Sequence, residues 1–334
     1  MASADPRLPA DVIDHAQLAM NYLDAFGDEI YSRYAETEWP EAVILDASPQ
    51  REKDTKEDGS KKQGGKRVFA ILGAYGYPNG LTGGGKLWRL AVHGAEDQVE
   101  WERFLTSMPG QPRWVVCDGS SAIANAVRAV WKGTVIYNCE WHIAHSGEEK
   151  LRPAELGDRY STLVRLVRRS VMGPVEWSEL EMAVAQLPAV PRRLDRWMRT
   201  QRRSLPRLWR RRVEDMSCGS GPLEQAFEEI NRSFRHRRFR FRNLGRLERV
   251  PATMLLAHNK VADERRYAKI IGDYLERQGL GLGASVGRWR NLADPKGTGS
   301  SVRELARQAA QRIAREKALT TQRQADARAR RLAA

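Results

Sequence analysis

Three carboxylates occupy positions from which a protein could hold divalent cations. Asp46 follows the apolar run 41–45, Asp118 follows the apolar run 114–117, and Glu224 opens the helical pattern of 223–234. Short β-branched runs are typical of buried strands, and the carboxyl ends of strands in open α/β sheets are where ligands collect. Three carboxylates drawn from three elements could hold the two hard cations that phosphodiester chemistry requires.

Each carboxylate also has a purely structural interpretation. Asp118 begins the sequence Asp-Gly-Ser-Ser, so it could simply cap the helix that starts near Ala122. Glu224 could be a first-turn acid favoured by the helix dipole, and Asp46 could end a strand by chance. Glu228 lies on the same helical stripe as Glu224, about 6 Å further along the axis, where it is better placed to pair with an arginine such as Arg232 or Arg235.

The elements that would position these residues follow from the apolar patterns. Five strands are predicted, at 41–45, 67–77, 86–94, 114–117 and 134–138. The second and third are separated by turn chemistry and should form an antiparallel hairpin, whereas the last two are linked by helical segments. We therefore expect an α/β fold with a ribonuclease-H-like mixed five-stranded sheet flanked by helices, interrupted by an all-helical insertion.

The same patterns divide the chain into five regions. We expect an N-terminal helical segment, the first part of the ribonuclease-H-like catalytic core, an arginine-rich helical insertion, the core helix that carries Glu224, and a basic helical C-terminal region. Their respective bounds are 1–40, 41–145, 146–216, 217–250 and 251–334.

Composition restricts the class of protein. A chain of 334 residues that is 41% hydrophobic can bury a sizeable core, and its net charge of +14 favours a polyanionic partner, nucleic acid before an anionic membrane surface. No apolar stretch is long enough to span a bilayer, and residues 1–17 lack the pattern of a signal peptide. Three cysteines are too few for a disulfide framework, so we expect a cytosolic protein.

Arginine-rich segments are the predicted DNA-binding surface, because guanidinium groups bind phosphate oxygens bidentately. Trp197 and Trp209 lie among these arginines and could stack on an unpaired base, although such residues more often form the core of their own helices. The arginines expected to contact DNA are Arg196, Arg203, Arg210, Arg235, Arg237, Arg238 and Arg240.

Cys139 and His142 have the spacing of a metal-binding pair. A structural zinc site needs four ligands, usually as two such pairs, and no second pair follows in the sequence. We therefore favour a different interpretation, in which Cys139 is a small buried residue and His142 orients a ligand or contacts the scissile phosphate.

Three segments of the chain resemble the conserved blocks of one family. Residues 115–145 resemble the second-aspartate region of bacterial insertion-sequence transposases of the Mutator-like kind, where Asp-Gly, a small-residue helix and a strand lead into Cys-x-x-His. Residues 219–243 are similar to the third block, with a catalytic Glu, an Asn and a Phe-x-Asn ending, and residues 41–49 look like the first. The resemblance covers roughly Glu41 to Arg249.

The resemblance implies a DDE transposase that cleaves and transfers DNA strands at insertion-sequence ends. Asp46, Asp118 and Glu224 would be the catalytic ligands of Mg²⁺, which Mn²⁺ could replace, and supporting roles would fall to Cys139, His142 and Asn231. The implied partners are double-stranded DNA and a second copy of the chain, in a bacterial cytoplasm at the nucleoid. Relatives carry a DNA-binding domain before the first aspartate, which we expect to be lacking here.

Two other functions fit the same residues. A ribonuclease-H-like nuclease would share the metal site without strand transfer. A domesticated transposase could bind DNA without using the three carboxylates at all.

Overall fold

The computed structural model describes residues 15–51, 67–79, 84–213, 219–234, 244–261, 264–280 and 302–333. The predictions for Arg235, Arg237, Arg238 and Arg240 lie outside these ranges, as do those for the Phe-x-Asn ending and the charged loop after residue 51.

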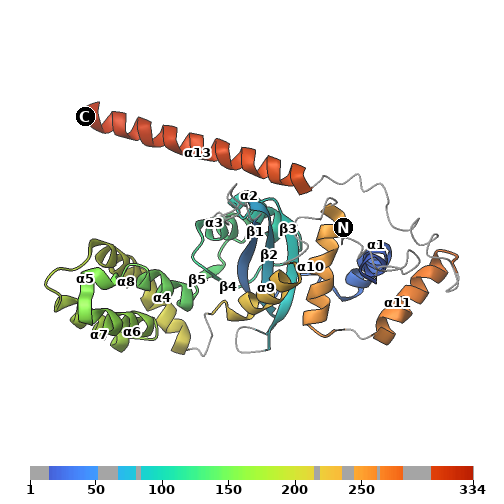
Figure 1. The fold of residues 1–334 in the computed structure, drawn as a ribbon, viewed down its shortest axis with the longest axis horizontal. Coiled ribbons are helices and arrows are strands. Elements are labelled where there is room, and N and C mark those ends of the chain that lie inside the picture. The colour runs from blue at the N-terminus through green and yellow to red at the C-terminus, as the bar shows by residue number, and fades with distance from the viewer. Residues whose placement is uncertain are drawn as a thin grey trace, which may run out of the picture.

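A five-stranded mixed sheet forms the centre of the structure (Figure 1). Its strands are β1 (Ala42–Arg51), β2 (Arg67–Tyr77), β3 (Lys86–His93), β4 (Trp114–Cys117) and β5 (Val135–Asn138), in the order β3-β2-β1-β4-β5. β2 pairs antiparallel with β1 and β3, whereas β4 pairs parallel with β1 and β5. The predicted α/β class, the mixed sheet and the hairpin are thus confirmed.

Alternate residues of the strands face two different layers of helices, as the two-residue period of a strand requires. On one face, Val43 and Leu45 pack with α2 (Gln98–Leu105) and α3 (Ser121–Val130). On the other, Ala42 and Ile44 pack with α9 (Gly221–Phe234) and α10 (Leu244–His258). α1 (His15–Tyr34) covers α10, and α11 (Glu264–Arg277) packs on α1.

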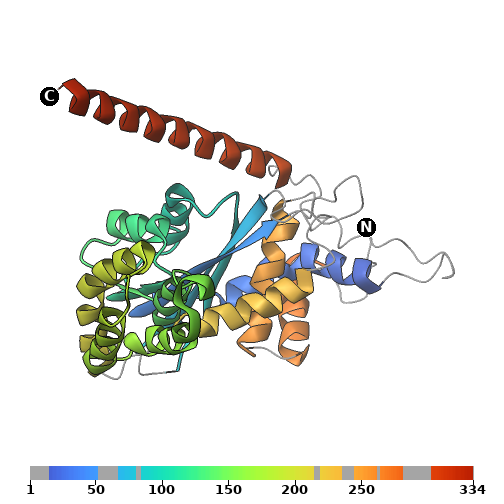
Figure 2. The ribbon, with the colours of Figure 1, turned by 60° about the vertical axis from the view of Figure 1, so that its left-hand side comes forward.

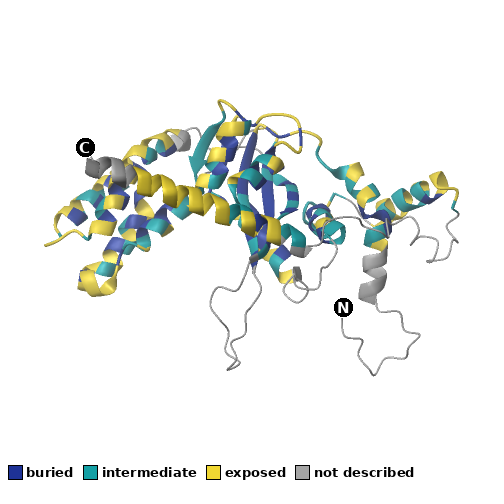
Figure 3. Ribbon diagram, turned by 90° about the horizontal axis from the view of Figure 1, so that it is seen from above, coloured by how far each residue is buried: buried dark blue, intermediate teal, exposed yellow. Residues whose placement is uncertain are grey.

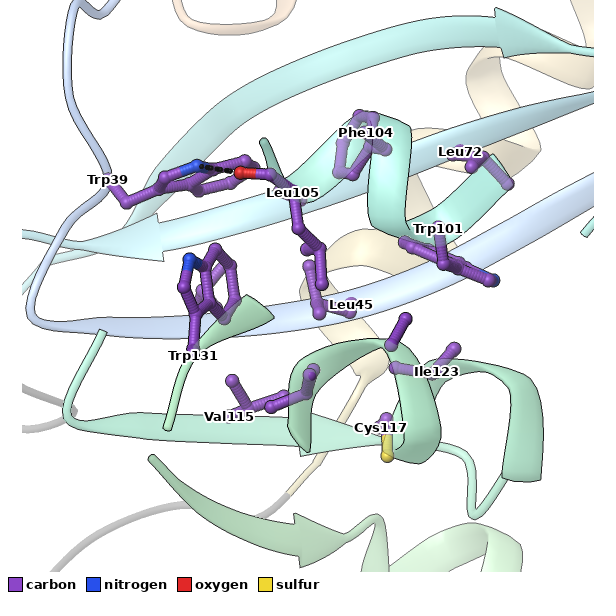
Figure 4. Close-up of a cluster of buried hydrophobic side chains, with 14 of the residues drawn as sticks. Trp39, Leu45, Leu72, Trp101, Phe104, Leu105, Val115, Cys117, Ile123 and Trp131 are labelled. Atoms are coloured by element: carbon purple, nitrogen blue, oxygen red, sulfur yellow. Dashed lines mark hydrogen bonds between the residues drawn. The ribbon is translucent and has the colours of Figure 1, made fainter. Parts of the chain in front are cut away.

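The α2–α3 face is held by an aromatic cluster (Figure 4). Trp101 is fully buried, and Phe104 meets both Trp101 and Trp39 edge to face, with ring centroids 5.5 and 5.6 Å apart. The buried indole N–H of Trp39 donates to the carbonyl oxygen of Leu105 at 2.8 Å, which satisfies the polar group of this side chain. This cluster packs against β1 and β4, the strands that precede or carry Asp46 and Asp118.

Between β5 and α9 the chain forms a separate group of helices. These are α4 (Glu140–Glu148), α5 (Pro153–Leu156), α6 (Tyr160–Ser170), α7 (Pro174–Ala185) and α8 (Arg192–Val213). They enclose a hydrophobic cluster of their own, in which Trp177 packs against both Trp197 and Trp209. The indole N–H of Trp197 donates to Ser146, and that of Trp209 donates to the Val171 carbonyl. The core interpretation of these two tryptophans is confirmed.

The long helix α13 (Val302–Ala333) is attached at its N-terminal part and extends clear of the body (Figures 1 and 2). Arg312 forms ion pairs with Asp97 and Glu100, both at 2.8 Å, and Ala309 packs closely against Gly94. Beyond these contacts the helix is mostly exposed (Figure 3). Among the described helices, none is both long and apolar enough to cross a membrane.

Candidate functional site

Asp46 lies within a strand rather than after one. We predicted that the strand would end at Leu45, but β1 continues to Arg51 because β2 pairs with it along its whole length, with Asp46 opposite Gly73. The parallel partner β4, in contrast, stops at Cys117 opposite Leu45. Asp46 therefore still stands where the parallel part of the sheet ends.

Asp118 occupies the matching position on β4. It is the first residue after Cys117, so it lies next to Asp46 in register. The two-residue period places both aspartates on the sheet face that α9 covers. The backbone N–H of Ser120 donates to Asp118 Oδ1 at 2.7 Å, but the cap of α3 is Ser120, not Asp118.

Glu224 reaches the same place from the first turn of α9. Leu223, Phe227 and Ile230 form an apolar stripe that this helix buries against the sheet. The backbone of Gly73 lies beneath this stripe, and a Cβ at that position would be 2.7 Å from the Phe227 ring. This close approach of helix and strand leaves Glu224 near enough for its charge to raise the pKa of Asp46.

Each carboxylate keeps one oxygen available. Asp46 Oδ1 accepts from the Ala47 N–H at 2.7 Å, Asp118 Oδ1 from Ser120, and Glu224 Oε1 from the Ser220 hydroxyl. The second oxygen of each group accepts no hydrogen bond from the described residues. Carboxylate oxygens of this kind suit a hard divalent cation such as Mg²⁺, although among the described residues the three side chains whose ligand atoms already converge are Cys139, His142 and Glu224, not the three carboxylates.

The charges of the other two carboxylates act on Asp46. Burial, helped by the negative charges of Asp118 and Glu224, raises the pKa of Asp46 to about 7, against the opposing effects of the Ala47 N–H and His142. A positive charge beside Asp46 would favour its ionised form.

Cys139, His142 and Glu224 form a second grouping that overlaps the first. Cys139 follows β5, next in register to Asp118, and His142 lies in the first turn of α4. Their ligand atoms and that of Glu224 lie within 4.8 Å of one another, with His142 Nδ1 4.0 Å from Glu224 Oε1. The structure therefore places the predicted supporting residues Cys139 and His142 beside the carboxylates.

Ser220 joins this grouping and was not predicted. Its backbone N–H donates to Cys139 Sγ at 3.4 Å, and its hydroxyl, which donates to Glu224, also lies 3.2 Å from Cys139 Sγ and contacts His142. Burial raises the pKa of the Cys139 thiol, but the hydrogen bonds from His142 and Ser220 outweigh burial and lower it. The hydrogen bond with Cys139 in turn raises the pKa of His142.

Asn231, the third predicted supporting residue, forms hydrogen bonds with β1 rather than with the carboxylates. Its Oδ1 accepts hydrogen bonds from Ser48 Oγ at 3.0 Å and from Gln50 Nε2 at 2.6 Å. Ser48 and Gln50 are buried polar side chains, so these bonds satisfy groups that would otherwise destabilise the fold. Asn231 thus fixes the C-terminal half of α9 to the strand that carries Asp46.

Trp141 is a second residue that the sequence did not single out. Its side chain is 56% exposed, its ring stacks on His145 at 4.8 Å, and it meets His142 edge to face. An exposed indole in contact with His142 offers a flat apolar surface beside the Cys139–His142–Glu224 grouping. Its position in the sequence, between Cys139 and His142, could have identified Trp141 as a candidate site residue.

Arginines line a cavity next to β5. The cavity, of about 310 Å³, lies between α8 and the end of β5, where Arg203 and Arg207 of α8 face Arg128 of α3. The guanidinium of Arg207 lies 5.6 Å from the centroid of the Tyr137 ring. Arg196, Arg203 and Arg210 are all exposed and lie seven residues apart, on one stripe of α8.

Comparison with known proteins returns no relative. No family model matches the chain, and no curated protein matches it significantly. A functional assignment therefore rests on the geometry of the site and the chemistry of its residues.

Proposed function

We propose that this protein is a DDE transposase, which cleaves and transfers DNA strands with a metal site on a ribonuclease-H-like fold. The observation that carries the proposal is that Asp46 and Asp118 occupy matching positions on adjacent parallel strands. In addition, α9 packs closely on β2, and the charge of Glu224 on this helix raises the pKa of Asp46. Mg²⁺ or Mn²⁺ held by these carboxylates would activate the attacking oxygen and stabilise the leaving oxygen of a phosphodiester.

The surroundings of the carboxylates fit a DNA substrate. The net charge of +14 favours a polyanion, and arginines line the cavity beside β5. Trp141 is suited to stack on a base that has left the duplex. Two DNA ends must be brought together for strand transfer, so we propose a homodimer on DNA, acting in the bacterial cytoplasm at the nucleoid.

Metal binding tests the proposal against a non-catalytic DNA-binding protein. Calorimetric titration of the wild-type chain with Mn²⁺ should show binding that Asp118→Asn weakens strongly, because the substitution removes one of three ligand charges. Circular dichroism should show that Asp118→Asn is folded. If wild type and Asp118→Asn bind Mn²⁺ equally, the carboxylates do not form the metal site.

A plasmid assay separates the transposase from the nuclease. Supercoiled DNA without an insertion-sequence end should stay largely intact, whereas DNA that carries the sequences flanking the gene should be cut at defined positions. Degradation of both plasmids without sequence preference would favour the nuclease.

Salt dependence tests the arginine surface. DNA affinity should fall steeply as salt rises. The double variant Arg203→Ala, Arg207→Ala should make the plot of log K against log salt shallower, by about 0.9 in slope for each phosphate that is no longer neutralised. The matched control is Arg199→Ala combined with Arg202→Ala, since these arginines of the same helix pair with Asp195 and Glu181, both at 2.7 Å. Equal slopes for the two double variants, measured by fluorescence anisotropy, would contradict this placement of DNA.

A further inference from the structure

We infer that Cys139, His142 and Glu224 form a binding site for Zn²⁺, or a cation of similar softness, distinct from the Mg²⁺ site although it shares Glu224. The three ligand atoms lie within 4.8 Å of one another, and among the described residues they are the grouping of Cys, His, Asp and Glu that meets this condition. Sulfur and imidazole nitrogen are ligands that zinc accepts readily and that magnesium avoids.

The geometry is close to what zinc requires. Tetrahedral zinc lies about 2.3 Å from sulfur and about 2.0–2.2 Å from nitrogen and oxygen, so its ligand atoms are separated by little more than 3 Å. His142 Nδ1 and Glu224 Oε1 are 4.0 Å apart, so they need to approach by less than about 1 Å to bind one zinc ion, and both belong to first turns of helices. Three protein ligands leave the fourth position open to water or to a phosphate oxygen.

The surroundings of Cys139 are those of a metal-bound thiolate. The sulfur accepts from the backbone N–H of Ser220, lies 3.2 Å from the Ser220 hydroxyl oxygen, and stands at the N-terminus of α4, where the helix dipole favours a negative charge. Cys117 provides the contrast. It is equally buried, but burial raises the pKa of its thiol to about 12, and it has no place in the grouping.

Sequence spacing alone argued against this site, because no second pair of ligands follows Cys139 and His142. The third ligand comes instead from α9, which the helices α5–α8 separate from this pair in the chain. A site with three protein ligands from two distant segments does not need the second pair.

Because the zinc site and the Mg²⁺ site both use Glu224, zinc binding should affect catalysis, an expectation that rests on the proposed function. Zinc bound by Cys139 and His142 would draw Glu224 away from Asp46 and Asp118, so zinc should inhibit strand cleavage in Mg²⁺. Zinc binding itself does not depend on that function.

Cobalt and zinc titrations of the full chain test the inference. Co²⁺ should produce a sulfur-to-cobalt charge-transfer band that Zn²⁺ abolishes and that excess Mg²⁺ leaves in place. Cys139→Ala should abolish the band and weaken Zn²⁺ binding by at least about 100-fold, and His142→Ala should weaken it similarly, whereas the matched variant Cys117→Ala should bind as the wild type does. His142 is partly exposed, so His142→Ala keeps the test valid if Cys139→Ala does not fold.

Zinc binding that survives both Cys139→Ala and His142→Ala, or no binding by the wild-type chain, would overturn the site. In cleavage assays, zinc should inhibit the wild type more than Cys139→Ala, each relative to its own zinc-free rate. If zinc binds with the expected dependence on Cys139 but the chain cleaves no DNA in any metal, the zinc site stands and the proposed transposase activity falls.

Discussion

Glu224→Gln is expected to reduce strand cleavage by about 100- to 1,000-fold, because the removal of a metal ligand's charge takes away several kcal/mol of transition-state stabilisation and each 1.36 kcal/mol is a factor of ten. The side chain is 40% exposed and the substitution nearly preserves its volume, so the free energy of unfolding should change little. DNA binding should also persist, since the arginine cavity lies on α3 and α8. Cleavage of DNA that carries the sequences flanking the gene, in Mg²⁺, measures the effect.

Glu228→Gln is the matched control on the same helix. Glu228 lies one turn beyond Glu224, is 74% exposed, and pairs with Arg232 at 3.0 Å, as its position in the sequence predicted. An exposed pair of this kind contributes little to stability, so Glu228→Gln should keep most of the activity. An active Glu224→Gln beside an inactive Glu228→Gln would reverse the assignment of the catalytic carboxylate.

The sequence predicted the sheet well because its strands carry local signals. β-branched apolar runs marked β2 to β5, and the turn residues after Tyr77 indicated the hairpin. The second half of β1 carried no such signal, since residues 46–51 are mostly polar and include Pro49. Ser48 and Gln50 are tolerated inside the fold because Asn231 accepts their hydrogen bonds. A partner that lies this far away in the chain cannot be found from local pattern.

The sequence indicated the candidate carboxylates but not the side chains that surround them. The strand ends and the start of α9 indicated the three carboxylates, since each stands beside a recognisable element. The grouping of Cys139 and His142 with Glu224 depends on how α9 sits on the sheet, and Ser220 enters only through that placement. Periodicity predicts which face of a helix is buried, but not which residue of another element it will meet.

Gly73→Ala should impair both stability and cleavage, although residue 73 contacts neither metal nor DNA in the proposed mechanism. An added Cβ would be 2.7 Å from Phe227 Cζ and 3.1 Å from Leu223 Cδ1. Phe227 is only 5% exposed, so its ring cannot swing into solvent, and α9 must move outward instead. Overpacking of this kind costs about 1–3 kcal/mol, and a displacement of about 1 Å at a catalytic group can lower a rate about 100-fold.

Two further variants isolate the cause. Gly84→Ala, before β3, is the matched control, because an added Cβ there meets no atom within 4 Å, and it should melt and cleave as the wild type does. Phe227→Leu should partly restore the Gly73→Ala variant, since it removes the ring atoms that clash, and the two changes should therefore be strongly non-additive in thermal melts. If Gly73→Ala matches Gly84→Ala in both melting and cleavage, the approach of α9 to β2 does not control the position of Glu224. If Phe227→Leu restores melting but not cleavage, then the position of Glu224 depends on the Phe227 ring itself, and the helix needs this aromatic contact to hold its carboxylate beside Asp46.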